Sequence, residues 1–435
     1  MIKAVIVVGG PQKGTRFRPL SLNCPKPLFP IAGIPMIEHL IKACVKVSEM
    51  KEIILIGFYQ LDEMFKEFIQ SMILKYRIQI RYLQEYVPLG TAGGIYHFRD
   101  MICLGEPDAV FLINGDVCGN FDLEKMLTFH RTLPKTKLIS VMATEATRSQ
   151  SLEYGCIVEN KETHEMLHYV EKPSSFVSNT ISCGVYLFSL ELLNCLSTIF
   201  LDKHQTNGLD EFQSDEELAL TFENNPQTNS ISLENDVLST LLDSKRVFVF
   251  QQQDHFWWSP IKTPGSAIYA NRNYLNLYRR LQPNILSSSD DDNGPKIVGD
   301  VYIHPTAIVD PTATIGPNVS ISEGVKIGAG VRIKESIILK NVNINNHSLI
   351  MYSIVGWNCA IGFWSRVEGT PCDPNPNKAF AKMDNLPLFD GDGKLNPLIT
   401  VLGCNVQIAP EIIVLNSVVL PYKEINRSYK NEIIL

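Results

Sequence analysis

Several features that mark other classes of protein are missing from this sequence of 435 residues. Its ten cysteines include no Cys-x-x-Cys pair, so neither a zinc site nor a disulfide framework is expected. No apolar stretch approaches membrane-spanning length, and Gly9-Gly10 interrupts the short apolar run at the N-terminus, so no signal peptide is expected. The net charge of −7 argues against general nucleic-acid binding. We therefore expect a cytoplasmic protein that binds neither membranes nor nucleic acid.

The first two thirds of the chain alternate strand-like apolar runs with amphipathic helical stretches. Helical spacing of apolar residues is found at 36–47 and 63–74. The expected strands are 4–8, 53–56, 80–83, 110–113, 139–143 and 184–188. This alternation predicts a Rossmann-like α/β domain over residues 1–285, built on a mostly parallel sheet. The polar stretch 202–230 is expected to be a surface insertion, and the hydrophilic stretch 286–296 a linker.

A different period begins after the linker. Aliphatic residues recur every six positions from Ile303 to Leu339, continue shifted by one from Ile338, and recur again from Leu402 to Leu420. A period of six fits neither a helix nor an alternating strand. It is typical of the hexapeptide repeat of a left-handed parallel β-helix, in which each aliphatic side chain points into a triangular prism. We therefore predict a β-helix domain over residues 297–435.

The repeat is interrupted at residues 369–398, a stretch rich in Pro, Asn, Asp and Gly. Loops of this length are usually functional or disordered. We favour an interaction loop over a decorative one, because the stretch also contains apolar residues. The candidates for contact with a partner protein are Phe380, Leu386, Leu388 and Phe389.

A Gly-Gly pair and a basic turn follow the first expected strand. Gly9 and Gly10 would let the backbone approach phosphates, and Arg16 and Lys26 would supply positive charge. The stretch is not a Walker loop, because Thr15 stands where that motif requires lysine. Taken alone, it is equally compatible with an ordinary strand-to-helix loop.

Further motifs distinguish these alternatives. Gly9 to Pro27, Leu89 to Gly94, Asn114-Gly115-Asp116 and Glu171-Lys172-Pro173 follow one another in a fixed order. In this order they resemble the sugar-1-phosphate nucleotidyltransferases, which transfer a nucleoside monophosphate to a sugar phosphate and release pyrophosphate. The resemblance to the mannose-1-phosphate guanylyltransferase branch extends over the whole chain. It implies GDP-mannose as a ligand, a catalytic beta subunit of the same fold as a partner, and self-association.

The resemblance also assigns roles to individual residues. Arg16 and Lys26 match the clamp on the triphosphate. Gln84 and Gly90 match positions that read the base, and Gly93-Gly94 would allow close backbone approach. Glu171 matches a residue that binds sugar hydroxyls, Lys172 one that holds the sugar phosphate, and Gly155 belongs to the same substrate site. Asp116 matches the first carboxylate of the family's Mg²⁺ site.

The second metal carboxylate of the active members has no counterpart here. Aligning Trp258 with the family tryptophan places Pro260 at the aspartate position, and aligning Trp257 places Ser259 there. Neither residue is an acid, and Lys262 adds a cation nearby. The longer loop Pro11–Lys13 also departs from the active pattern, and Ser182 stands where the family often has a sugar-binding asparagine. Mg²⁺ is thus expected at an incomplete site, if at all.

These departures favour a nucleotide-sugar-binding regulatory subunit that restrains a catalytic partner. One alternative is an active guanylyltransferase that uses Asp116 and a water-filled second site. Another treats the β-helix as an acyltransferase, but His304 and His347 are isolated. The exchange-factor subunits of translation initiation share this layout but usually carry a C-terminal helical extension, for which no segment is found here.

Overall fold

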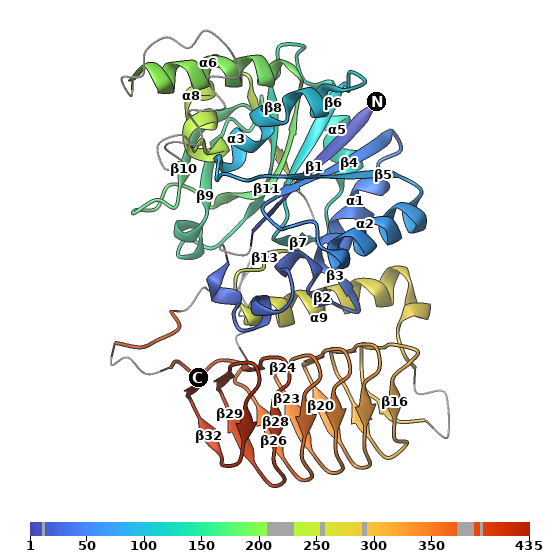
Figure 1. The fold of residues 1–435 in the computed structure, drawn as a ribbon. Helices are drawn as coiled ribbons and strands as arrows, with labels where there is room; N and C mark the ends of the chain where they lie inside the picture. Colours follow the sequence, from blue (N-terminus) through green and yellow to red (C-terminus); the bar gives the residue numbers. More distant parts are fainter. Residues whose placement is uncertain (11–13, 207–229, 253–256, 289–293, 372–386, 392–394) are drawn as a thin grey trace. The chain divides into compact units, whose positions relative to one another are not determined.

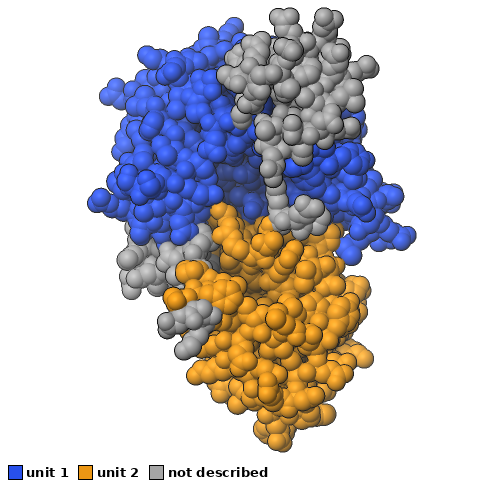
Figure 2. Space-filling view, turned by 60° about the vertical axis from the view of Figure 1, so that its left-hand side comes forward, with its two compact units in different colours: residues 1–10, 40–258, 377–382 blue, residues 11–39, 259–376, 383–435 orange. Residues whose placement is uncertain are grey.

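A computed structural model describes residues 1–10, 14–206, 230–252, 257–288, 294–371, 387–391 and 395–435. Backbone contacts divide these residues into two compact units (Figure 2). The first unit contains residues 1–10 and 40–258. The second contains residues 14–39 and the described residues from 259 to 435. The sequence pattern changes once, near residue 285. The backbone contacts divide the chain differently, because they place residues 14–39 and helix α9 (Pro264–Leu281) in the same unit as the β-helix.

The first unit is built on a mixed nine-stranded sheet with strand order β10-β9-β11-β6-β1-β4-β5 (Figure 1). Off this path, β8 pairs with β11, and β12 pairs with β8. The strands are β1 Ile2–Gly9, β4 Met50–Gly57, β5 Gln79–Gln84, β6 Ala109–Asn114, β8 Ile139–Glu145, β9 Gly155–Glu159, β10 Met166–Glu171, β11 Thr180–Phe188 and β12 Val247–Gln251. The four strands β5, β4, β1 and β6 are parallel. Each of the six predicted strands lies within an observed one, and β11 runs antiparallel to β6 and β8.

Helices connect these strands. They are α1 Met36–Val45, α2 Glu63–Tyr76, α3 Gly90–His97, α4 Arg99–Cys103, α5 Leu123–Thr132 and α6 Glu191–Thr206. Both predicted helices are therefore present. Asp62 caps α2 by accepting a hydrogen bond from Phe65 N at 2.9 Å, which explains where that helix begins. Of the predicted insertion 202–230, residues 207–229 lie outside the described part of the chain.

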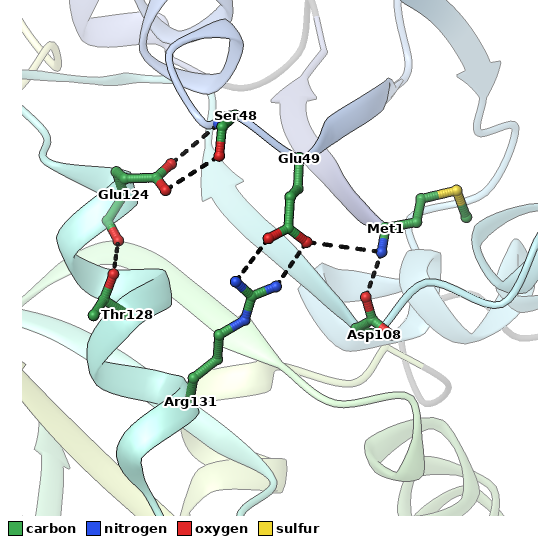
Figure 3. Close-up of polar contacts among 7 residues, drawn as sticks. All are labelled: Met1, Ser48, Glu49, Asp108, Glu124, Thr128 and Arg131. Carbon is green, nitrogen blue, oxygen red and sulfur yellow. Dashed lines mark hydrogen bonds and ion pairs between the residues drawn. The ribbon is translucent and has the colours of Figure 1, made fainter.

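Polar contacts hold α5 at the amino end of the sheet (Figure 3). Arg131 makes two hydrogen bonds to the Glu49 carboxylate, of 2.8 and 2.7 Å, and they lower the pKa of Glu49. The α-amino group of Met1 donates to Asp108 and lies 4.0 Å from Glu49. Because β1 runs from Ile2 to Gly9, these contacts lie at the end of the strand opposite to the Gly-Gly pair.

The C-terminal part of the second unit is a solenoid of parallel strands arranged in three sheets (Figure 1). This arrangement is consistent with the predicted left-handed β-helix. The first sheet contains β14 Lys296–Ile297, β17 Thr314–Ile315, β20 Arg332–Lys334, β23 Leu349–Met351, β26 Arg366–Glu368, β29 Ile413–Leu415 and β32 Tyr429–Lys430. The second contains β15 Val301–Ile303, β18 Val319–Ile321, β21 Ile337–Ile338, β24 Ser353–Val355, β27 Thr400–Leu402, β30 Val418–Val419 and β33 Ile433–Ile434. The third contains β16 Ile308–Val309, β19 Lys326–Ile327, β22 Asn343–Ile344, β25 Ala360–Ile361, β28 Gln407–Ile408 and β31 Glu424–Ile425.

The shift in the repeat corresponds to a change from eighteen-residue to seventeen-residue coils. Ile303 pairs with Ile321, eighteen positions later, whereas Ile321 pairs with Ile338, seventeen positions later. Ile338 again pairs with Val355, seventeen positions later. Glu335 turns the corner between these coils in the left-handed region, with φ +48°. The register slips again near the end, so that Val419 belongs to the interior cluster, whereas the predicted Leu420 is only half-buried.

The insertion leaves and re-enters the solenoid at one place. The β24 ladder passes directly to β27, with Val355 paired to Leu402, so stacking of the coils continues across the gap. Thr370 N donates to Leu398 O at 2.9 Å and closes the base of the loop. Phe380 and Leu386 lie outside the described residues, whereas Leu388 and Phe389 are described and are 45% and 46% exposed.

The early segment 14–39 packs against α9 (Pro264–Leu281) and the β-helix within the second unit. Its short strands β2 (Pro30–Ile31) and β3 (Ile34–Pro35) form a tight hairpin. Ala32 N donates to the side-chain oxygen of Asn271 at 2.9 Å, and the fully buried Asn271 amide donates to Asn318 O at 3.3 Å. Phe29 contacts the Trp357 ring edge-on, with centroids 6.2 Å apart. This segment therefore depends on the β-helix for its packing.

No helix in the described part of the chain is long and apolar enough to cross a membrane. The nine cysteines within the described ranges are all free thiols.

Candidate functional site

The carboxyl ends of β1 and β6 form the first part of the candidate site. Gly9 has φ +68°, and a Cβ on Gly10 would lie 2.5 Å from the Phe58 side chain, so both positions favour glycine. Gly115 N donates to Val7 O at 2.8 Å, which brings the turn after β6 against the end of β1. Backbone turns therefore meet at the edge where ligands bind in parallel α/β sheets.

Asp116 follows this turn and is partly exposed, between β6 and β7 (Val117–Gly119). Within the described ranges, His, Cys, Asp and Glu side chains form no group of three that could hold a metal ion. The described side chains around Asp116 therefore offer Mg²⁺ no such cluster of three ligands.

The predicted base-side loop is held by its own protein neighbours. A Cβ on Gly90 would lie 2.3 Å from Ile231 O, and Gly90 has φ +81°. Ala92 N donates to that same carbonyl at 3.0 Å. Gly94 faces the buried Glu85, whose Oε1 would lie 2.4 Å from an added Cβ. Gly93 and Gly94 were predicted to be glycines so that the backbone could approach a ligand. In this structure, close packing against other protein atoms already requires glycine at both positions.

The predicted sugar-side residues lie close together on β9 and β10. Tyr169 donates to Glu171 Oε2 at 2.7 Å, and Lys172 Nζ lies 3.6 Å from Glu171 Oε1. A Cβ on Gly155 would lie only 2.1 Å from the Tyr169 hydroxyl, which explains the glycine. Lys172 has φ +46°, its backbone N donates to Tyr154 O at 3.1 Å, and its side chain is 60% exposed. The arrangement presents a carboxylate and an ammonium group side by side.

The tryptophan of the altered motif is firmly held. Trp258 Nε1 donates to Cys183 O at 2.9 Å, and its ring meets Tyr154 edge-on, with centroids 5.2 Å apart. The two residues that follow, Ser259 and Pro260, are buried and uncharged. Ser182 is turned inward, where its hydroxyl accepts a 3.3 Å hydrogen bond from Gly184 N. The loop Pro11–Lys13 lies outside the described residues.

The predicted phosphate clamp belongs to the second unit. Lys26 is 9% exposed, and its Cδ would lie 3.6 Å from a Cβ on Gly14. Arg16 is exposed, and the neighbouring Phe17 is buried against Phe29, with ring centroids 5.0 Å apart. Arg16 and Lys26 are therefore positioned by a segment whose own packing is provided by α9 and the β-helix.

Two residues of the first unit, Tyr169 and Glu234, escaped the sequence motifs, whereas Asn114 belongs to one of them. Tyr169 orients Glu171, Asn114 fills the space beside Gly184, and Glu234 bonds to side chains of α3 and β11. Tyr169 had a detectable signal, since it stands two positions before Glu171 on the same face of a strand. Glu234 had none, because its contacts join segments far apart in the sequence.

Fold and site together define a protein of the nucleotidyl transferase class. Residues 3–275 match the family described as "Nucleotidyl transferase", and residues 297–434 match "GMPPB C-terminal domain". The chain belongs to the nucleotidyl transferase family, among the alpha subunits of mannose-1-phosphate guanylyltransferase. It is 54% identical over 435 residues, all of both chains, to "Mannose-1-phosphate guanylyltransferase regulatory subunit alpha-B" of Danio rerio. It is 53% identical, again over all of both chains, to the regulatory subunit alpha proteins of Xenopus tropicalis and Rattus norvegicus.

Proposed function

We propose that this chain is the regulatory subunit of mannose-1-phosphate guanylyltransferase, that it binds GDP-mannose, and that it restrains a catalytic beta subunit. The carrying observation is the pair Ser259 and Pro260, which puts uncharged side chains where the active family members place a metal-binding aspartate. The names of the full-length relatives support the regulatory role. The cytoplasm is the proposed location.

The ligand residues are proposed from the resemblance to the family. Gln84 and Gly90 lie on the base side, Glu171 and Lys172 on the side of the mannosyl phosphate, and Arg16 and Lys26 supply positive charge for phosphates. Charge-assisted contacts to phosphate are among the strongest hydrogen bonds in proteins. Asp116 is the one predicted metal ligand, so a Mg²⁺ ion would be held mainly by phosphate oxygens of the ligand. This arrangement supports binding without efficient transfer.

Contact with the catalytic subunit is assigned to the insertion 369–398. Its described apolar residues Leu388 and Phe389 are about half exposed, whereas Leu395 is 5% exposed and pairs with Phe389. Large exposed apolar residues on a solenoid loop often form a binding face. Self-association of the chain is proposed as well.

The experiment measures two properties of the purified chain. Calorimetry should detect GDP-mannose binding, and an assay with GTP, mannose-1-phosphate and Mg²⁺ should detect little turnover. Turnover of about 1–10³ s⁻¹, the ordinary enzyme range, would support the alternative of an active guanylyltransferase instead. A preparation made without any co-purified beta subunit is the necessary control.

A further inference from the structure

We propose that Glu234 is a positioning residue that couples the base-side loop to the sugar-side residues of the nucleotide-sugar site. The inference rests on the proposed function, because the site it organises is the one assigned to GDP-mannose. Glu234 lies in a π-helical turn, η5 (Leu233–Leu238), which packs against both α3 and β10. Single π-type turns occur frequently at functional sites.

The Glu234 carboxylate collects three hydroxyl donors from three different segments. Its Oε2 accepts from Thr91 Oγ1 at 3.1 Å and from Ser232 Oγ at 2.9 Å. Its Oε1 accepts from the Tyr186 hydroxyl at 3.2 Å. Thr91 in turn accepts from Leu233 N at 2.8 Å. The first turn of α3, which begins at Gly90, is therefore joined to η5 and to β11 through the side chain of Glu234.

The sugar side joins the same cluster through two tyrosines. Tyr186 and Tyr169 are 2% and 7% exposed and belong to one buried cluster. Burial is the main cause of the raised pKa of both phenols, and the negative charge of Glu234 also raises both values. Both phenols therefore stay protonated near neutral pH and donate to carboxylates, Tyr186 to Glu234 and Tyr169 to Glu171. Glu171 is the residue expected to hold sugar hydroxyls.

Two variants separate positioning from simple stabilisation. Glu234→Ala removes the acceptor and leaves the Thr91 and Tyr186 hydroxyls without it, whereas Glu234→Gln keeps a carbonyl oxygen for Thr91 and Ser232. Asp236→Asn is the matched control in the same turn, because Asp236 accepts its hydrogen bond from the backbone N of Ser232, at 2.7 Å.

The decisive quantity is the contribution of the mannosyl group, measured as the ratio of the dissociation constants of GDP and GDP-mannose. If Glu234 couples the two sides, Glu234→Ala should lower this ratio about tenfold, corresponding to a coupling of roughly 1.4 kcal/mol. Glu234→Gln should largely restore it, and Asp236→Asn should leave it near the wild-type value. In a Tyr169→Phe background, Glu234→Ala should have a much smaller effect on the ratio.

Hydrogen exchange of the ligand-free protein gives a second, independent measurement. Glu234→Ala should speed exchange in the first turn of α3 and at the end of β10 together, and Glu234→Gln should not. If wild-type protein fails to bind GDP-mannose, the proposed function falls, and exchange alone decides whether Glu234 joins the two segments. An unchanged ratio, or faster exchange in α3 without β10, would overturn the inference.

Discussion

Buried His130 should make the first unit less stable as pH falls below about 6.5. His130 lies on α5, is 3% exposed, and its Nδ1 lies 2.7 Å from the hydroxyl of Ser140 on β8. Burial lowers its pKa from 6.5 to about 4, and the neighbouring charges of Lys137 and Arg131 add to the effect. The folded protein therefore keeps this imidazole neutral where an unfolded chain would protonate it.

The sign and size follow from proton linkage. Between these two pKa values the unfolded state binds more protons, so the free energy of unfolding falls as the pH falls. One pKa unit corresponds to about 1.4 kcal/mol, so the full loss is about 3 kcal/mol, of which about 2 kcal/mol is reached near pH 5. The loss from this group levels off below about pH 4, where the folded protein also protonates the imidazole.

The assay is urea unfolding between about pH 7.5 and pH 5, followed by hydrogen exchange of α5. Carboxylates also begin to titrate in this window, so the informative comparison is His130→Asn, which keeps a polar atom for Ser140 but has no ionisable ring. This variant should be less stable near neutral pH, because it loses ring volume, and should show a flatter pH dependence. His168→Asn, at an exposed position on β10, should retain the wild-type slope. Parallel slopes for wild type and His130→Asn would refute the argument.

Three further predictions concern the ligand, the chemistry and the partner. Lys172→Ala should weaken GDP-mannose binding by roughly 1.5–3 kcal/mol, because it removes a charge-assisted contact to phosphate. The melting temperature should not change, because the side chain is largely exposed. Unchanged affinity in calorimetry would show that Lys172 is only a surface residue. Pro260→Asp alone should not restore full guanylyltransferase activity, because Lys262 and the longer Pro11–Lys13 loop remain; full rescue in the turnover assay would show these departures to be harmless. Replacing residues 371–397 by a short Gly-Ser linker should preserve the β-helix and GDP-mannose binding but abolish inhibition of the beta subunit, as measured by titrating GDP-mannose into the reconstituted complex. Inhibition at full strength would assign control to another surface.

The sequence was most informative where a period repeats. Strands with residues buried on both faces, such as β1, read as unbroken apolar runs, and the six-residue spacing located the β-helix interior as far as Val414. Each additional coil reinforces such a signal. One-residue slips, as at Leu420, are harder to foresee because they depend on how a corner such as Glu335 is turned.

The site was predicted less completely, because side chains from distant segments build it. Tyr169, Glu171 and Lys172 lie within one short stretch and could be grouped from the sequence. Glu234 reaches Thr91 across 143 positions, and no local pattern indicates such a bond. Gly90 and Gly94 show the opposite problem. Their motif suggests a bound ligand, but packing against Ile231 and Glu85 explains why both positions are glycine.

The dependence of segment 14–39 on the β-helix also constrains the order of folding. Ala32 and Asn271 are separated by 239 positions, and Phe29 packs on Trp357, which is made later still. Contacts of such sequence separation form slowly, and domains fold as their chain emerges during synthesis. On the ribosome, the central strands of the sheet can pair long before α9 and the β-helix, against which segment 14–39 packs, have been made. The segment that carries Arg16 and Lys26 is thus ordered among the last steps. A chain halted before the β-helix would contain the sheet without an ordered segment 14–39.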